Sequence, residues 1–227
     1  MSGWSELAKR WDEYGAPFRP TEEVVKIFEK EIISGGRTLL LGATPELQKL
    51  AHLAIDNNMD SINIHKPPSS LLADWRHMPL PPKSFDTVIG DGSLNVIDDG
   101  YSLLFPEVMR VLKPDGKLIL RVFTAPEKQD SLEEVLSKKS QFIGFWAFKL
   151  AVYQVLANPF VKIIDVQEAV ASVWEHPNLK INRDPATIYY FPKLSELPTW
   201  DCIQYANSYE LAERCPVITW VNHANLV

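Results

Sequence analysis

The first 125 residues alternate between short apolar runs and stretches in which apolar side chains recur every three or four positions. Short apolar runs bounded by turn residues predict strands, and the longer periodic stretches predict helices. The expected strands are Arg37–Gly42, Ser61–His65, Phe85–Ile89 and Lys117–Phe123, and the expected helices are Thr21–Ile33, Thr44–Asp56 and Tyr101–Leu112. This order predicts βαβ crossovers and a doubly wound α/β sheet.

The pattern changes after Phe123. Three helices are expected in succession, at Asp130–Lys139, Phe142–Leu156 and Val161–His176, and strands return at about 200–205 and 216–221. We therefore predict one domain over residues 1–227 with a helical insertion over residues 126–195. An insertion at this place suits a lid or substrate lobe, although helices that merely cover the sheet would give the same pattern.

The composition, 46% hydrophobic and 23% charged in 227 residues, is that of a globular protein. A net charge of −6 argues against a partner held through nucleic-acid phosphates. Cys202 and Cys215 have no CxxC spacing, so both are expected in the core, without a disulfide framework or zinc site. The most apolar segment, Phe142–Val161, is interrupted by Lys149 and Gln154, which argues against a membrane span. A soluble, cytoplasmic protein with no metal, membrane or nucleic-acid partner is expected.

Candidate chemistry lies at the expected strand ends, because open α/β sheets bind ligands there. Gly42 and Ala43 let a ligand approach the backbone, but their turn lacks the GxGxxG pattern of dinucleotide sites. Asp74 followed by Trp75 suits a purine, since the carboxylate accepts from an exocyclic amine and a ring face covers the base. Asp91, between two glycines, suits an ammonium group or a substrate proton. Turn and packing roles for these residues remain open.

Three segments carry a recognisable order: LLLGATPEL (39–47), DWRHMPLPPKSFDTVIGDGSLN (74–95) and LFPEVMRVLKPDGKLILRVF (104–123). Together they resemble the class I S-adenosylmethionine-dependent methyltransferases. The chain is similar to a subgroup whose first motif reads LGxTPEL and whose last segment is like YELAERCP (209–216). The resemblance implies a Rossmann-like, mostly parallel seven-stranded sheet with an antiparallel last strand. It also implies S-adenosylmethionine as cofactor, across the ends of strands one, two and four.

The same resemblance implies roles for particular residues. Asp74 would accept from the adenine amine, with Trp75 beside the ring. Residues 1–33 would form an N-terminal helical cap in which Arg19 pairs with the methionine carboxylate, although Arg19 equally suits a surface charge. The methionine part and the sulfonium would be lined by Gly42, Ala43, Thr44, Asp91 and Gly92.

Two positions depart from the family pattern. The usual first turn is acid-x-Gly-x-Gly-x-Gly, whereas here Gly42 remains and Pro45-Glu46 follow. The family ends its second strand with an acid that takes both ribose hydroxyls, and the expected strand Ser61–His65 puts His65 there. A neutral imidazole accepts one hydrogen bond. Losing a charged partner costs roughly 1.5–3 kcal/mol, or about ten- to a hundredfold in affinity.

Methyl transfer from a sulfonium is an in-line displacement, so alignment and water exclusion matter more than a general base. Asp91 and His176 are candidates for a base if the acceptor must lose a proton, although a lone histidine is more often structural. The aromatic residues of the insertion suit a packed helix face better than an acceptor pocket: Phe142, Phe145, Trp146, Phe148 and Tyr153.

Three functions stay open. The leading one is methyl transfer to a small molecule, which agrees with the acidic composition and the long insertion. The second is a degenerate interaction protein that binds the cofactor weakly or not at all, motivated by the altered first turn and His65. The third, a nicotinamide-dependent oxidoreductase, is disfavoured because the phosphate-binding glycines are missing.

Overall fold

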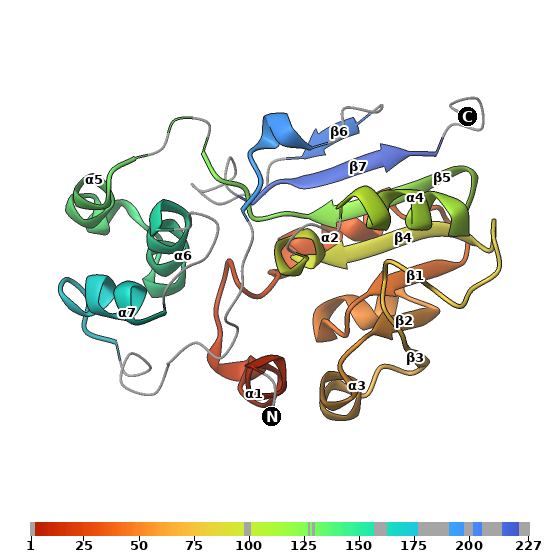
Figure 1. The fold of residues 1–227 in the computed structure, drawn as a ribbon, viewed down its shortest axis with the longest axis horizontal. Helices are drawn as coiled ribbons and strands as arrows, with labels where there is room; N and C mark the ends of the chain where they lie inside the picture. Colours follow the sequence, from red (N-terminus) through yellow and green to blue (C-terminus); the bar gives the residue numbers. More distant parts are fainter. Residues whose placement is uncertain are drawn as a thin grey trace.

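A computed structural model describes residues 3–97, 101–126, 128, 130–156, 163–176, 191–197, 202–205 and 215–222. Its seven-stranded sheet has the order β3-β2-β1-β4-β5-β7-β6 (Figure 1). β7 runs antiparallel to β5 and β6, and the other neighbours pair in parallel. The strands are β1 (Thr38–Leu41), β2 (Leu53–Asp56), β3 (Ser70–Leu72), β4 (Phe85–Asp91), β5 (Leu112–Arg121), β6 (Cys202–Tyr205) and β7 (Val217–Val221). The predicted doubly wound, mostly parallel seven-stranded sheet is confirmed.

Helices cover both faces of this sheet. Alternate side chains of β1 enter different cores, as the period of a strand requires. Leu39 and Leu41 pack in the cluster that contains the apolar face of α4 (Tyr101–Val111). Leu40 packs in the cluster that contains α2 (Glu22–Glu31) and η2 (Pro45–Leu50). Helix α2 begins where it was predicted.

The second strand lies earlier in the chain than predicted. The expected helix Thr44–Asp56 divides into η2 and the strand β2. The expected strand Ser61–His65 is part of helix α3 (Met59–His65), which Asn58 caps by accepting the backbone N–H groups of Asp60 and Ser61. Short apolar runs do not distinguish a strand from a buried helix by periodicity alone. The residue that ends the second strand is therefore Asp56 and not His65.

The insertion contributes three helices in succession, as expected: α5 (Leu132–Ser137), α6 (Phe145–Leu156) and α7 (Ile163–Ala171), with η4 (Lys139–Gln141) between the first two. A backbone bridge between Ala125 and Lys193, which precedes η6 (Leu194–Glu196), joins the two ends of the insertion. In Figure 1 these helices gather beyond the end of the sheet to which β4 and β5 point. The role of the insertion as a lid or substrate lobe stays a prediction.

A separate core joins the insertion to the N-terminal segment. Tyr14 and Phe18 pack in one cluster with buried residues of α6. The predicted aromatic residues belong to this cluster or pack against it, as a helix core rather than an open pocket: Phe142, Phe145, Trp146, Phe148 and Tyr153. Cys215 is buried, as expected, whereas the side chain of Cys202 lies outside the described residues.

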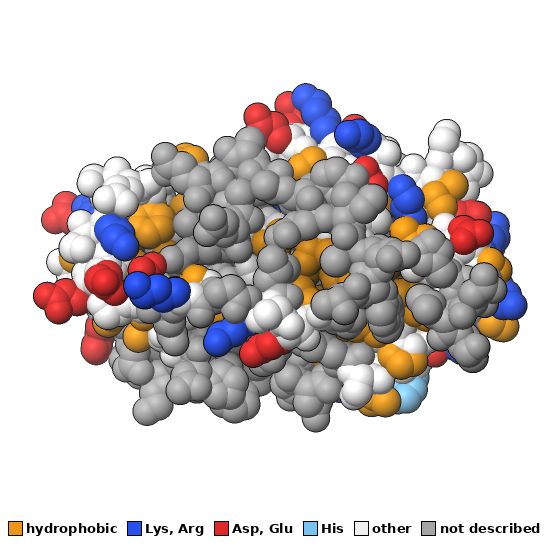
Figure 2. Space-filling view, turned by 90° about the horizontal axis from the view of Figure 1, so that it is seen from above, with side chains coloured by type: hydrophobic (Ala, Val, Ile, Leu, Met, Phe, Trp, Pro, Cys, Tyr) orange, Lys and Arg blue, Asp and Glu red, His pale blue; other side chains and the backbone are white. Residues whose placement is uncertain are grey.

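Basic and acidic side chains of the described residues are intermixed on the face seen in Figure 2, without a large patch of one sign. Among the helices that the structure describes, none has the length and apolar character needed to span a bilayer.

Candidate functional site

A cavity of about 270 Å³ lies at the ends of β1, β2 and β4. The strand order reverses between β1 and β4, which is where open α/β sheets bind ligands. Most of the predicted cofactor residues line this one cavity: Gly42, Ala43, Thr44, His65, Asp74, Trp75, Asp91 and Gly92. Arg19 and His176 are outside the lining. Contact with a cofactor stays a prediction for each residue.

The turn after β1 brings backbone to the cavity wall. Gly42 has a φ of 108°, a conformation that favours glycine. Its N–H donates to the Ile55 carbonyl at 2.8 Å. The same carbonyl accepts a 2.6 Å hydrogen bond from the Trp75 indole. The ends of β1 and β2 and the indole are therefore fixed together in one wall.

Asp56, which the sequence analysis did not select, ends β2 and lines the same cavity. Its Oδ1 accepts the backbone N–H of Asn58 at 2.8 Å, which fixes the carboxylate. Burial raises the pKa of Asp56 to about 6, and backbone hydrogen bonds oppose the rise. A fixed, ionisable carboxylate at this strand end can accept from a vicinal diol. The strand-ending acid that seemed to be replaced by His65 is thus present, three residues before α3 begins.

His65 lines the cavity from the last turn of α3. Its ring meets the Trp11 ring edge-on, with the centroids 5.7 Å apart. Burial lowers the pKa of His65, so its neutral form is favoured. The residue therefore belongs to the covered side of the cavity rather than to a strand end.

Asp74 follows β3 and is partly exposed at the cavity wall. The Arg76 side chain donates to both its carboxylate oxygens, from Nε to Oδ1 at 3.0 Å and from Nη2 to Oδ2 at 2.7 Å. These hydrogen bonds hold the pKa of Asp74 below its usual value. An ionised acceptor is therefore maintained beside the Trp75 ring.

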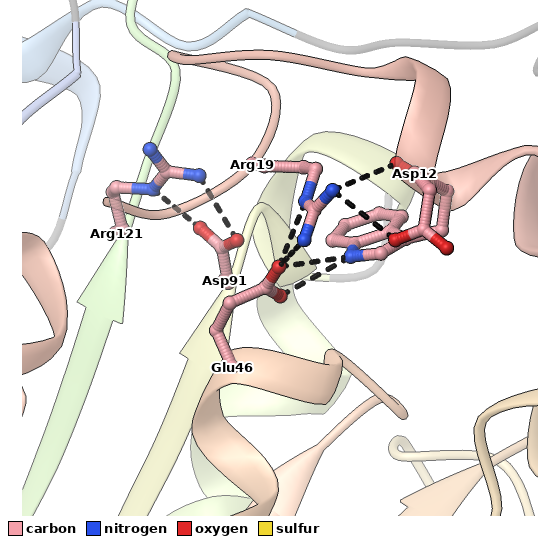
Figure 3. A network of polar contacts seen from close by, with 6 residues as sticks. Asp12, Arg19, Glu46, Asp91 and Arg121 are labelled. Carbon is pink, nitrogen blue, oxygen red and sulfur yellow. Dashed lines mark hydrogen bonds and ion pairs between the residues drawn. The ribbon is translucent and has the colours of Figure 1, made fainter. Parts of the chain in front are cut away.

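Asp91 is engaged in a buried ion pair at the end of β4. The Arg121 guanidinium donates from Nη2 to Oδ2 at 2.9 Å and from Nε to Oδ1 (Figure 3). The two side chains are 3% and 0% exposed. Burial raises the pKa of Asp91, and the charge of Arg121 opposes the rise. The expected base is therefore already committed to a cation in this arrangement.

The N-terminal segment lines one side of the cavity, and its role as a cap stays a prediction. Its contribution comes from α1 (Gly3–Lys9), from η1 (Trp11–Glu13) and from the turn after it. Ser5 of α1 donates to Asp60 of α3 at 2.6 Å, which ties this segment to the sheet side. The lining residues from this segment are Trp4, Leu7, Ala8, Trp11, Tyr14 and Phe18.

Arg19 is held at the edge of this cover. Its Nη2 lies 2.7 Å from Glu46 Oε1, and its Nη1 lies 3.3 Å from Asp12 Oδ1. The Trp11 indole also donates to Glu46, at 3.1 Å (Figure 3). Glu46 was noticed in the sequence only as a departure from a glycine pattern, and this partnership could not be foreseen.

His176 lies in the insertion and does not line the cavity. Its ring stacks on Phe145, with centroids 4.0 Å apart, and meets Trp146 edge-on. Burial and the nearby Lys149 charge lower the pKa of His176. Its surroundings are those of a packed aromatic cluster.

The family model described as a methyltransferase domain matches residues 35–120. No curated protein matches the sequence. A putative S-adenosylmethionine-dependent methyltransferase from Methanococcus maripaludis aligns over 98% of this chain and 95% of its own, at 15% identity and TM-score 0.54. A putative zinc-dependent alcohol dehydrogenase from Rhodobacter sphaeroides aligns over 96% of this chain and 97% of its own, at 12% identity and TM-score 0.55. The alignment with a protein from Pyrococcus horikoshii covers 54% of this chain and 62% of that protein, at 22% identity and TM-score 0.43.

Residues 35–120 thus match a methyltransferase domain, and the chain has the Rossmann-like fold of methyltransferases. The Methanococcus maripaludis and Rhodobacter sphaeroides structures are below 25% identity and show the fold alone. Among the described residues, no three His, Cys, Asp or Glu side chains gather as a metal site. The subgroup defined by the LGxTPEL motif stays a prediction.

Proposed function

We propose that this protein binds S-adenosylmethionine in the cavity and transfers its methyl group to a small-molecule acceptor. One observation carries the proposal: Gly42, Asp56 and Asp74 line a single cavity from the ends of β1 and β2 and from the turn after β3. The residues fit the cofactor chemically, because Asp56 suits the ribose hydroxyls and Asp74 the adenine amine. Gly42 leaves backbone, rather than a side chain, at the wall.

The bound cofactor would supply an electrophilic methyl group on a sulfonium. The chain's own residues bind, orient and exclude water, which is the larger part of catalysis for a displacement of this kind. Tyr14, Phe18 and Phe123 line the cavity with rings. Asn95 fixes Phe123, since its amide donates to the Phe123 carbonyl at 2.7 Å and accepts the Phe123 N–H at 2.9 Å.

The competing function is a degenerate interaction protein. The unusual first turn still favours it, but Asp56 removes the second reason, which was the apparent loss of the strand-ending acid. Calorimetric titration separates the two functions. We expect heat on addition of S-adenosylmethionine or S-adenosylhomocysteine and none with NAD. Silence with both sulfur ligands at millimolar concentration would favour the interaction protein.

Asp74→Ala is expected to weaken S-adenosylhomocysteine binding by about tenfold, the loss of one hydrogen bond to a charged group. Folding should be little affected, because the Asp74–Arg76 pair is partly exposed and joins near neighbours in sequence. Titration calorimetry gives the affinity, and circular dichroism checks the fold. An unchanged affinity would remove the adenine assignment.

The affinity for S-adenosylhomocysteine is expected to fall as the pH falls through about 6, because Asp56 takes up a proton there. The ionised form holds both ribose hydroxyls, so affinity should be lower by about tenfold at one pH unit below this pKa. The sign for folding is opposite: a carboxyl with a raised pKa in the folded state adds stability as the pH falls from 6. The assignment would be contradicted if the affinity were constant between pH 7.5 and 5. It would also be contradicted if the affinity of Asp56→Asn fell with pH as steeply as that of the wild type.

A further inference from the structure

The part of the cavity nearest the ends of β4 and β5 is lined by aromatic rings. Tyr14 and Phe18 come from the segment after η1, and Phe123 follows β5. The Phe18 ring centroid lies 6.3 Å from that of Tyr14 and 6.0 Å from that of Phe123. All three residues are buried, although they line the cavity. We call these three residues the ring wall.

The ring wall is supported from behind by helix α6, whose rings are outside the cavity lining. The Trp146 ring centroid lies 4.8 Å from that of Tyr14 and 5.9 Å from that of Phe18. The Tyr153 ring lies 5.8 Å from Phe18 and meets it edge-on. A Cβ added at Gly15 would meet the Trp146 ring at 2.5 Å, so the N-terminal segment and α6 are in close contact. The insertion therefore fixes two of the rings that line the cavity.

The third ring is fixed against the turn after β4. A Cβ added at Gly92 would lie 3.3 Å from the Phe123 ring, so the glycine leaves room for that ring. The buried Asn95 side chain holds the Phe123 backbone through both its N–H and its carbonyl. Phe123 thus lies beside Gly92, one of the residues expected near the sulfonium.

The ring wall itself carries no charge at pH 7.5. Within the described part of the chain, the charge next to it comes from Asp91, which Arg121 neutralises through a 2.9 Å hydrogen bond to Oδ2 (Figure 3). The Arg121 guanidinium also lies 5.2 Å from the Phe123 ring centroid. A cationic acceptor would meet this charge and the sulfonium as well. An acceptor of either sign would lose its water without gaining an ion partner from the ring wall.

We infer that the methyl acceptor binds against the ring wall through an uncharged aromatic ring. The inference rests on the proposed function and names the chemical class of the acceptor. Aromatic rings pair edge-to-face or offset with centroids about 4.5–7 Å apart. The rings of the wall already pair at such distances, so a flat, uncharged ring can extend their array. The adenine of the cofactor would lie on the other side of the cavity, beside Trp75.

The test uses three bicyclic probes of similar size that differ in charge. At pH 7.5 quinaldine is uncharged, N-methylquinolinium is a cation and quinaldate is an anion. Each probe is titrated into wild-type protein saturated with S-adenosylhomocysteine, and saturation-transfer NMR measures the affinity. We expect quinaldine to bind without displacing S-adenosylhomocysteine. Both charged probes should bind at least about tenfold more weakly, because their charge would be buried without a partner.

Phe18→Leu keeps an apolar side chain in the ring wall but removes the ring. Affinity for quinaldine should fall by about three- to tenfold, the contribution of one aromatic pair, while affinity for S-adenosylhomocysteine changes by less than about twofold. Phe148→Leu is the matched control, because Phe148 is buried in the same core cluster as Phe18 but is outside the cavity lining. That variant should bind both ligands as the wild type does. Circular dichroism of each variant confirms that it is folded.

The inference would be overturned if either charged probe bound as tightly as quinaldine, or if quinaldine failed to bind or displaced S-adenosylhomocysteine. These comparisons use the wild type and do not depend on the folding of a variant. No loss of quinaldine affinity in Phe18→Leu, or an equal loss in Phe148→Leu, would also overturn it. In each of these outcomes binding of S-adenosylhomocysteine would still support the proposed function. A wild-type protein that does not bind S-adenosylhomocysteine would instead refute the proposed function, and this inference with it.

Discussion

Asp56→Asn is expected to lower the affinity for S-adenosylhomocysteine by about a hundredfold at pH 7.5, where the wild-type carboxylate is ionised. The carboxylate is fixed at the end of β2 by the Asn58 N–H and lines the cavity. Each hydrogen bond from a ribose hydroxyl to the charged acceptor contributes roughly 1.5 kcal/mol of binding free energy, so losing both costs about 3 kcal/mol. Asparagine keeps the size and an oxygen for Asn58, so the turn after β2 should survive. Titration calorimetry measures the change.

The same substitution should not weaken the fold at this pH. Burial raises the pKa of Asp56, which means that the ionised carboxylate is disfavoured in the folded state. Asp86→Asn is the control, because Asp86 lies at the opposite end of β4 and pairs with Lys113 at 2.8 Å. That variant should bind the ligand normally. Normal binding by Asp56→Asn, or loss of binding together with loss of the folded state, would contradict the assignment.

The sheet could be predicted from sequence because its central strands are apolar runs between clear turn signals. The error at the second strand has a physical cause. Leu53–Asp56 is a run of four residues, too short to show a period, while Ser61–His65 alternates like a half-buried strand. The contrary signal was present in Asn58 with Asp60, which is typical of a helix start. If Leu53–Asp56 had been chosen as the second strand, Asp56 would have been the acid at its end.

The cavity lining was predictable to the extent that it follows strand ends. Gly42, Asp74 and Asp91 come from such positions, and all line the cavity. The charge partners of Asp91 and Arg19 were not predictable, because the pairs Asp91–Arg121 and Arg19–Glu46 join residues far apart in the chain. Local spacing carries no information on such contacts. The role proposed for Asp91 therefore changed most once its partner was known.

Asp91→Ala is expected to destabilise the protein by about 3–5 kcal/mol, because it leaves the Arg121 guanidinium buried without its carboxylate. Arg121 is 0% exposed and cannot regain water without disturbing β5. Chemical denaturation at pH 7.5 measures the free energy of unfolding. The double change Asp91→Leu with Arg121→Met removes both charges and should recover much of the loss, because a well-packed apolar pair can replace a buried ion pair.

Lys113→Met provides the comparison, since it breaks the Lys113–Asp86 pair, in which the lysine side chain is 43% exposed. Such a pair should contribute less than about 1 kcal/mol. If Asp91→Ala cost no more than Lys113→Met, the buried pair would not stabilise the end of β4. Asp91 would then be available as a base, and pH profiles of methyl transfer should depend on it. If the large cost is found, the carboxylate serves to neutralise Arg121, and proton removal from an acceptor must be assigned to another group.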